Sequence, residues 1–389
     1  MTTPNPIRIY LVDGQAYIYR AFYAVRELQT SQGFPTNAIF GFTNMLQRLL
    51  QDQQPQHLAV VFDAKGKTFR NDLYTAYKAN RSAMPETMRP QIPRIKDVVR
   101  AYRIPVLELE GYEADDIIAT LADHWEKQGA EVVIVSGDKD LMQMVSDHVT
   151  MLDTMKGEQI GIAEVRAKFG VEPARVVDVQ GLMGDATDNI PGIPGVGEKT
   201  AIKLIHEWHD LENLLRHADE IPGKLGEKIR ANVELARVSK TLATLHRDVP
   251  VHVSLPDLAI EEPDRQQLAA LFQEFEFRRL LADIQASMGS LAPAATEAPP
   301  DTGVYETVRT ATHLDDVLRA IRHAKTFCLD TETTSLNPLE AELVGVSLAI
   351  EERKAWYIPV GHNTLDAVPH LTRAEVLTAL RSLLLKIAR

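Results

Sequence analysis

Three short apolar runs, each followed by an acidic residue, constrain the fold of this chain more than any other feature. They are residues 7–14 (IRIYLVDG), 57–66 (HLAVVFDAKG) and 131–140 (EVVIVSGDKD), and residues 104–111 (IPVLELEG) form a fourth run. Continuously apolar runs are typical of strands that are buried on both faces of a parallel sheet. Helical patterns such as NAIFGFTNMLQRLLQ lie between them. The alternation predicts an α/β domain, with a parallel sheet and helices on both faces.

The pattern changes twice further along the chain. From Ala163 onward it is mostly helical, and residues 287–303 (SMGSLAPAATEAPPDTG) are rich in Ala and Pro, which is typical of an exposed linker. The runs TFCLDTETTSL and AELVGVSLAI then resemble two strands of a new α/β unit, which ends within a helical pattern and looks incomplete. We therefore expect an α/β domain over residues 1–175, a helical region over 176–285, a linker over 286–303 and the first part of another α/β domain over 304–389.

The composition is that of an ordinary soluble protein, with 45% hydrophobic and 25% charged residues. Cys328 is the only cysteine, so no disulfide can form within the chain, and a reducing compartment fits. The N-terminus carries no signal segment, and no apolar run approaches the length of a membrane span. These features predict a protein of the cytoplasm.

The net charge of −12 is unevenly distributed. Residues 64–103 hold ten basic side chains against three acidic ones, and residues 224–247 hold six against two. An acidic protein with local basic surfaces can still bind a phosphate backbone. The overall charge therefore does not exclude nucleic acid as a partner.

Acidic residues gather where the predicted strands end. The carboxyl ends of parallel strands converge on one crevice of an open sheet, where ligands bind. Seven carboxylates fall there: Asp13, Asp63, Asp138 and Asp140 after the first, second and last strands, and Glu113, Asp115 and Asp116 at the start of the helix after the fourth run. Asp185 and Asp188 follow in GLMGDATDNIPG, three residues apart and so on one face if that turn is helical.

Carboxylates that converge repel one another, and burial would raise their pKa values unless a positive charge lies among them. A pair of Mg²⁺ ions supplies that charge, and two such ions are a clamp for phosphoryl transfer. Helix capping could explain Glu113, Asp115 and Asp116, and turn chemistry or a phosphoacceptor domain could explain single strand-end aspartates. The agreement of four separate segments favours a metal cage.

Residues 190–205 (IPGIPGVGEKTAIKLI) contain a glycine-rich turn that fails the P-loop spacing by one residue. We interpret it as a helix–hairpin–helix, with the hairpin at Gly195 to Gly197 and with Ala201 and Leu204 packing the second helix. Backbone N–H groups there could approach a DNA phosphate at a helix N-terminus. The alternative is a Gly/Pro turn that only caps a helix.

The basic segment YKANR places Lys78 and Arg81 three residues apart, which predicts one helical face. Tyr74 and Tyr77 lie beside them and would suit stacking on an unpaired base. The alternative is a solvated basic face. The position between two acidic motifs favours a role in holding substrate.

The motifs LVDG, VVFDAKGKTFR, YKANR, EADD, SGDKD and MGDATDNIPGIPGVGEKTA, in this order over residues 7–283, resemble the 5′-nuclease domain of bacterial DNA polymerase I, a relative of the flap endonucleases. The resemblance implies a PIN-like sheet and a two-metal site. Its metal ligands would be Asp13, Asp63, Glu113, Asp115, Asp116, Asp138, Asp140, Asp185 and Asp188, with Lys78, Arg81, Asp115 and Asp116 as the catalytic residues. Asp13, Asp63 and Asp115 would lie closer to one metal ion, and Asp138, Asp140 and Asp188 closer to the other. Glu113 and Asp115 would lie near both.

The same resemblance implies DNA contacts from Arg70, Tyr77, Lys78, Arg81, Gly195, Gly197, Lys199 and Thr200, and a K⁺ ion at the hairpin. FCLDTETTSLNP resembles the first motif of a 3′→5′ exonuclease with an RNase H-like fold, with Asp330 and Glu332 as metal ligands. Residues that would carry nucleotide polymerisation are absent.

The function implied is that of a structure-specific 5′→3′ exonuclease and 5′-flap endonuclease with two Mg²⁺ ions, for which Mn²⁺ substitutes. It would act as a monomer on DNA with a flap, nick or RNA primer, in replication and repair in the bacterial cytosol. A DNA-binding module without catalysis and a PIN-like ribonuclease stay open as alternatives.

Overall fold

The computed structural model describes residues 6–289, 304–324, 326–334, 341–351, 354–361 and 371–387. The chain divides into two compact units, Met1–Leu291 and Ala292–Arg389, and each is described by itself. None of the helices in these ranges combines the length and the apolar character needed to cross a membrane.

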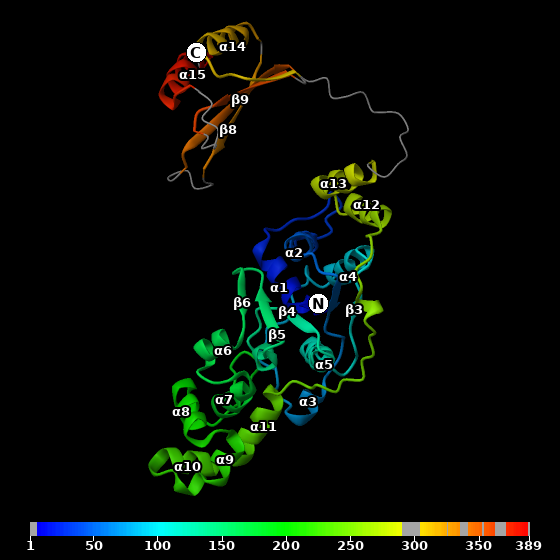
Figure 1. The fold of residues 1–389 in the computed structure, drawn as a ribbon, viewed down its shortest axis with the longest axis vertical. Helices are drawn as coiled ribbons and strands as arrows, with labels where there is room; N and C mark the ends of the chain where they lie inside the picture. Colours follow the sequence, from blue (N-terminus) through cyan, green and yellow to red (C-terminus); the bar gives the residue numbers. More distant parts are fainter. Residues whose placement is uncertain are drawn as a thin grey trace, which may run out of the picture. The chain divides into compact units, whose positions relative to one another are not determined.

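The first unit is built on a sheet of six strands in the order β3-β2-β1-β4-β5-β6 (Figure 1). The strands are β1 (Arg8–Asp13), β2 (His57–Val61), β3 (Val106–Leu107), β4 (Glu131–Val135), β5 (Val149–Asp153) and β6 (Glu158–Ile160). All neighbours are parallel except β5 and β6, which are antiparallel. The expected parallel sheet is therefore confirmed, with β1, β2 and β4 at the three apolar runs.

The fourth run forms much less strand than expected. Only Val106 and Leu107 pair with β2, at the edge of the sheet. Glu108 and Glu110, which follow, are exposed. An edge position with charged side chains ends the strand early, because the segment gains no second neighbour there.

Alternate side chains of the central strands enter two separate cores, as expected for strands buried on both faces. In β1, Ile9 and Leu11 belong to one core, and Tyr10 and Val12 belong to the other. The second core holds residues of α1 (Gly14–Ala24), α2 (Asn37–Gln53), α4 (Gln91–Ala101), α12 (Arg265–Glu274) and α13 (Arg278–Gly289). The last two helices thus return to the sheet, although α12 and most of α13 fall within the predicted helical region 176–285.

The other core joins the sheet to α5 (Ala114–Lys127) and continues into a helical region. That region contains α6 (Ile162–Phe169), α7 (Val176–Met183), α8 (Glu198–Trp208), α9 (Leu211–Arg216), α10 (Gly223–Ala231) and α11 (Val233–Ala243), while the short α3 (Phe69–Leu73) precedes α4 (Figure 1). Short 3₁₀ turns lie at Asp140–Met144, Pro173–Arg175, Ala218–Glu220 and Pro256–Leu258. Since one core spans both parts, the sheet and the helical region fold as one body.

The second unit has a four-stranded sheet in the order β7-β10-β9-β8. Its elements are β7 (Val304–Thr307), α14 (Ala311–His323), β8 (Cys328–Thr333), β9 (Leu343–Glu351), β10 (Lys354–Pro359) and α15 (Arg373–Ile387). The two strands expected after the linker are β8 and β9, which pair antiparallel. Of the predicted linker, residues 286–289 belong to α13, and residues 290–303 lie outside the described residues.

Candidate active site

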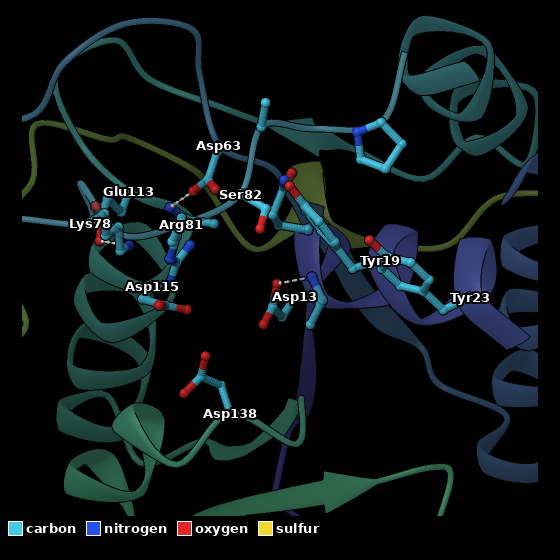
Figure 2. A pocket seen from close by; sticks show the side chains of 15 residues that line it. Asp13, Tyr19, Tyr23, Asp63, Lys78, Arg81, Ser82, Glu113, Asp115 and Asp138 are labelled. Atoms are coloured by element: carbon cyan, nitrogen blue, oxygen red, sulfur yellow. Dashed lines mark hydrogen bonds and ion pairs between the residues drawn. The ribbon is translucent and has the colours of Figure 1, made fainter. Parts of the chain in front are cut away.

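A cavity of about 380 Å³ opens at the carboxyl ends of β1, β2 and β4 (Figure 2). The chain runs from β1 to β2 and β3 on one side and then crosses to β4 on the other, so the topological switch point lies beside β1. Ligands of open α/β sheets bind at such a point. The residues that line the cavity are Asp13, Gln15, Ala16, Tyr19, Tyr23, Asp63, Lys78, Arg81, Ser82, Ala83, Pro85, Glu113, Ala114, Asp115 and Asp138.

Five of the nine predicted carboxylates line this cavity, which confirms that the strand ends bring acidic residues together. Figure 2 shows Asp13, Asp115 and Asp138 pointing into it from three different segments. Asp13 also caps the N-terminus of α1: its Oδ1 accepts a hydrogen bond from the backbone N–H of Ala16 (2.9 Å), and its Oδ2 accepts one from Ser136 Oγ (2.8 Å). The carboxylate therefore joins the end of β1 to the loop after β4.

Asp63 plays the same part between β2 and α5. Its Oδ1 accepts a hydrogen bond from the backbone N–H of Ala114 (2.8 Å), the first residue of α5. Ser136, which sequence reasoning missed, is buried and accepts from the N–H of Asp138 (3.0 Å). Its position in the sequence, directly after the apolar run of β4 and two residues before Asp138, was the available signal.

The charge of these carboxylates is poorly compensated. Burial raises the pKa of Asp13 to about 6, and repulsion from Asp138 and Asp63 adds to the rise. Burial also raises the pKa of Asp63, and burial together with the charges of Asp138 and Asp13 raises the pKa of Asp115 well above its ordinary value. Asp140 has a pKa of about 7 for the same two reasons, burial and a nearby Asp138. Such a set favours a bound cation.

Three basic side chains partly offset that charge. Lys78 Nζ lies 2.9 Å from Glu113 Oε2 and 3.6 Å from Asp188 Oδ2, and Arg81 Nη2 lies 2.5 Å from Asp188 Oδ1. Lys139, which sequence reasoning did not single out, lies 2.5 Å from Asp185 Oδ2. Its position between Asp138 and Asp140 was the available signal.

The expected helix at YKANR is wrong, although Lys78 and Arg81 do meet at one carboxylate. Residues 75–80 form turns, and Lys78 has a φ of 56°, in the left-handed region. Its backbone N–H donates to the carbonyl oxygen of Asp188 (2.9 Å). The N–H of Lys78 therefore bonds a distant loop instead of the carbonyl oxygen of Tyr74, which it would bond in a helix.

Asp185 and Asp188 do not share a helical face either. Asp185 pairs with Ile190 through two backbone hydrogen bonds (2.9 and 2.8 Å), so the segment between them is a closed loop. Its side chain bonds Lys139, while that of Asp188 bonds Arg81. Asp140 accepts a hydrogen bond from Gln180 Nε2 (2.6 Å), which brings α7 to the same region.

Asp116 lies away from the cavity, in contrast to the predicted ligand set. Its two oxygens accept hydrogen bonds from Arg70 Nη1 and Nη2, both at 2.7 Å, and both side chains are buried. Burial would raise the pKa of Asp116, but the hydrogen bonds and charge of Arg70 lower it. The predicted contact between Arg70 and DNA needs correction as well, because the guanidinium has no access to solvent.

Tyr77 is also buried, which argues against stacking on a base. Its hydroxyl donates toward Glu113 Oε2 (3.1 Å) and Asp188 Oδ2 (3.3 Å), so it orients one cavity carboxylate and one carboxylate beside the cavity instead. The aromatic rings on the cavity are those of Tyr19 and Tyr23, four residues apart on α1. That helical spacing directly after Asp13 was the signal missed in the sequence.

The donor chemistry of the cavity fits a hard divalent cation, since carboxylate oxygens are its preferred ligands. Within the described ranges, however, no three Asp, Glu, His or Cys side chains are grouped closely enough to hold one metal ion. The carboxylates would have to approach one another around the ion. Such a movement would break the ion pairs with Lys78, Arg81 and Lys139 and replace them with contacts to the metal ion.

The glycine-rich turn connects α7 to α8. Gly195 has a φ of +81°, and Gly197 precedes the first residue of α8. Ala201 and Leu204 are buried, as expected, whereas Gly195, Gly197 and Lys199 are exposed and Thr200 is half-buried. In the second unit, Asp330 and Glu332 are both exposed on β8.

Three protein families match this chain. Residues 8–170 match the 5′-3′ exonuclease N-terminal resolvase-like domain, residues 171–266 match the 5′-3′ exonuclease C-terminal SAM fold, and residues 305–387 match a 3′-5′ exonuclease.

Curated relatives include a 5′-3′ exonuclease of Aquifex aeolicus, which is 42% identical over 73% of this chain and 99% of its own length. They also include DNA polymerase I of Chloroflexus aurantiacus and of Pseudomonas aeruginosa, each 41% identical over 96% and 97% of this chain. The chain spans 43% and 42% of the length of these two polymerases.

Among solved structures, the phage T5 5′-exonuclease with bound zinc ions has a TM-score of 0.52 and 20% identity, over 72% of this chain and 98% of that one. A T5 D15 flap endonuclease variant with DNA and metal ions has the same score and coverage. At this identity the likeness concerns the fold.

Proposed function

Because this chain belongs to the 5′-3′ exonuclease family, as its motifs predicted, we propose that it is a structure-specific 5′ nuclease. It would hydrolyse a phosphodiester near the junction between duplex DNA and a single-stranded 5′ flap. One observation carries the proposal: Asp13, Asp63, Glu113, Asp115 and Asp138 line one cavity at the switch point of the sheet, together with Lys78 and Arg81.

The metal ligands that we propose are the five cavity carboxylates, with Asp140, Asp185 and Asp188 beside them. Mg²⁺ is the expected ion, two ions the expected number, and Mn²⁺ a substitute. Bound there, the ions would lower the pKa of an attacking water and offset the charge that develops on the phosphate. Asp13 and Asp63 would keep their places through the hydrogen bonds to Ala16, Ser136 and Ala114.

Lys78 and Arg81 would hold the phosphate groups of the frayed strand. Both cations already reach the cavity from the 75–81 turn, and Arg81 is about half exposed. When Glu113 and Asp188 turn toward metal, the two basic side chains lose their partners, and a phosphate can take that place.

The duplex would bind the hairpin between α7 and α8, through backbone N–H groups near Gly195 and Gly197 and through Lys199 and Thr200. A K⁺ ion at this hairpin is part of the proposal. The contact is sequence-independent, because it involves phosphates alone.

The biological role that we propose is removal of RNA primers and damaged 5′ ends, by a monomer in the bacterial cytosol. The relatives named DNA polymerase I are more than twice as long as this chain, and nothing in the present sequence supports polymerisation. In the second unit, Asp330 and Glu332 stay a prediction for a 3′-5′ exonuclease site.

The test is cleavage of an end-labelled duplex with a 5′ flap by the purified chain, with Mg²⁺ or with EDTA. We expect a short product near the junction with Mg²⁺ only. Asp115→Asn should reduce cleavage by about 100-fold or more while flap binding in EDTA survives. Binding without any product would indicate a DNA-binding module, and better cleavage of unstructured RNA would indicate a ribonuclease.

A further inference from the structure

We propose that Arg70 and Asp116 form a positioning pair, which holds Glu113 at the cavity and the segment after α11 in a fixed relation. In this role Asp116 is not a metal ligand. The proposal rests on the proposed function, since Glu113 matters here as a residue of the nuclease site. It departs from the assignment that the acidic motif EADD suggests by itself.

The pair is sealed inside the protein. Arg70 is 1% exposed and Asp116 is 0% exposed, and their two parallel hydrogen bonds are both 2.7 Å long. A bidentate guanidinium–carboxylate pair is directional as well as strong. Both oxygens of Asp116 are thereby committed to a protein partner behind the cavity.

The pair also holds the end of α11 and the backbone that follows it. Arg70 Nε donates to the carbonyl oxygen of Leu242 (2.9 Å), and Nη2 donates to that of Thr244 (3.1 Å). The N–H of His246 donates to Asp116 Oδ1 (2.9 Å). Two side chains from distant segments thus satisfy three buried or partly buried backbone groups in a stretch of five residues, which fixes the course of the chain there.

On the other side, the pair reaches the start of α5. The N–H of Glu113 donates to Asp116 Oδ2 (3.2 Å), and Arg70 Nη1 lies 3.5 Å from Glu113 Oε2. Asp116 is the third residue of α5, so it closes the first helical turn on which Glu113 and Asp115 lie. The orientation of that helical turn about the helix axis places the side chains of these two residues at the cavity.

The helix α11 extends the connection toward the hairpin. Ser239 Oγ accepts a hydrogen bond from the N–H of Gly192 (3.0 Å), just before the hairpin, and Lys240 Nζ lies 2.6 Å from Asp178 Oδ1 on α7. Contacts from named residues therefore run from the proposed duplex-binding hairpin through α11 and the buried pair to Glu113. Through these contacts, the position of a bound duplex and the position of the cavity carboxylates would be set relative to each other.

Two variants test this role. Arg70→Lys keeps a positive charge beside Asp116 but loses the fork that reaches Leu242 and Thr244. The double variant Arg70→Met with Asp116→Leu removes both charges, so no unpaired ion is left in the interior as it would be after a single deletion. It also removes the partners of the Leu242, Thr244 and His246 backbone groups, and calorimetry checks that it folds. Asp115→Asn, a change of a cavity carboxylate, is the matched control.

Three properties are measured on the whole chain: kcat and KM for flap cleavage, the number and affinity of bound Mn²⁺ ions, and hydrogen exchange of the His246 amide. For both pair variants we expect kcat to fall by about tenfold and KM to stay within about threefold. Mn²⁺ affinity should fall by no more than about threefold, because Glu113 and the other cavity carboxylates are still present. Exchange at His246 should be faster. The control should lose Mn²⁺ affinity by about tenfold or more.

Loss of Mn²⁺ affinity in the double variant, to the extent seen for Asp115→Asn, would make Asp116 a ligand and overturn the proposal. A wild-type kcat in either pair variant would overturn it too. If the unaltered chain does not cut the flap, the proposed function fails, whereas Mn²⁺ binding and the exchange at His246 still decide what the pair does.

Discussion

At the scale of single residues, Lys78 is a basic side chain that contacts two carboxylates at or beside the cavity. It pairs with Glu113 and Asp188, and its charge lowers the pKa values of Asp63 and Asp115, which burial raises. Lys78→Met should therefore reduce kcat by about 100-fold. It should also move the pH–rate profile to higher pH, because without this positive charge the carboxyl groups lose their protons only at higher pH.

The measurement for Lys78→Met is the pH–rate profile of flap cleavage at saturating Mg²⁺. Lys127→Met is a matched control, since Lys127 also pairs with a carboxylate, Asp123, but lies exposed on α5 away from the cavity. A wild-type profile for Lys78→Met would remove this residue from the site.

The raised carboxyl pKa values predict how metal and pH act together. A carboxyl group whose pKa is higher in the folded state contributes stability while it is protonated, and loses that contribution as pH rises through the folded pKa. For Asp13 and Asp140 that window ends near pH 6 and pH 7. We expect the Tm of the metal-free chain to fall from pH 5 to pH 8.

Mg²⁺ should reverse this fall, because it binds the ionised carboxylates. The rise in Tm on adding Mg²⁺ is then larger at pH 8 than at pH 5.5, as measured by calorimetry in both conditions. Asp138→Asn removes a charge that raises the pKa values of Asp13, Asp115 and Asp140, so it should flatten the dependence in metal-free buffer. An equal Mg²⁺ effect at both pH values contradicts the metal-cage interpretation.

Sequence reasoning predicts which segments meet at the cavity, but not the direction of each side chain. Glu113, Asp115 and Asp116 share one helical turn, and their order alone does not reveal that Asp116 points to Arg70. That rotation depends on backbone groups of residues 242–246, which lie more than a hundred positions further along the chain. The turn at Lys78 is fixed in the same way by a distant carbonyl.

At the scale of elements, β1, β2, β4 and the glycine-rich turn follow from local pattern, since buried apolar runs and glycine turns carry their own signals, whereas β3 is shorter than predicted. Substituting Gly195 gives a prediction that separates backbone strain, which lowers stability, from the proposed role of the hairpin in binding DNA. Its φ of +81° matches the +82° of Gly33, which lies in another loop. Gly195→Ala and Gly33→Ala should each cost about 1 kcal/mol of stability, because alanine is strained at such a φ.

Only Gly195→Ala should weaken flap binding, by about tenfold, because the hairpin backbone would have to shift away from the phosphates. A methyl group at Gly195 would also come within 2.4 Å of Lys228 Nζ, while at Gly33 nothing lies within 4 Å. Fluorescence anisotropy with a labelled flap in EDTA measures both variants at one salt concentration. Equal affinities for the two variants would show that the duplex binds elsewhere.

At the scale of the whole molecule, every residue that we propose for the 5′ nuclease lies in the first compact unit, Met1–Leu291. The cores support the division: the two cores around the large sheet hold residues up to Leu280, and the core of the second unit begins at Val308. A chain shortened to residues 1–291 should therefore fold and keep kcat/KM for flap cleavage within about threefold of the full chain, because it retains the whole site. The check is steady-state cleavage by both chains at equal Mg²⁺, alongside their unfolding by calorimetry. A shortened chain that unfolds cooperatively yet has lost cleavage would show that residues after 291 take part in the reaction, and the assignment of the activity to the first unit would have to be given up.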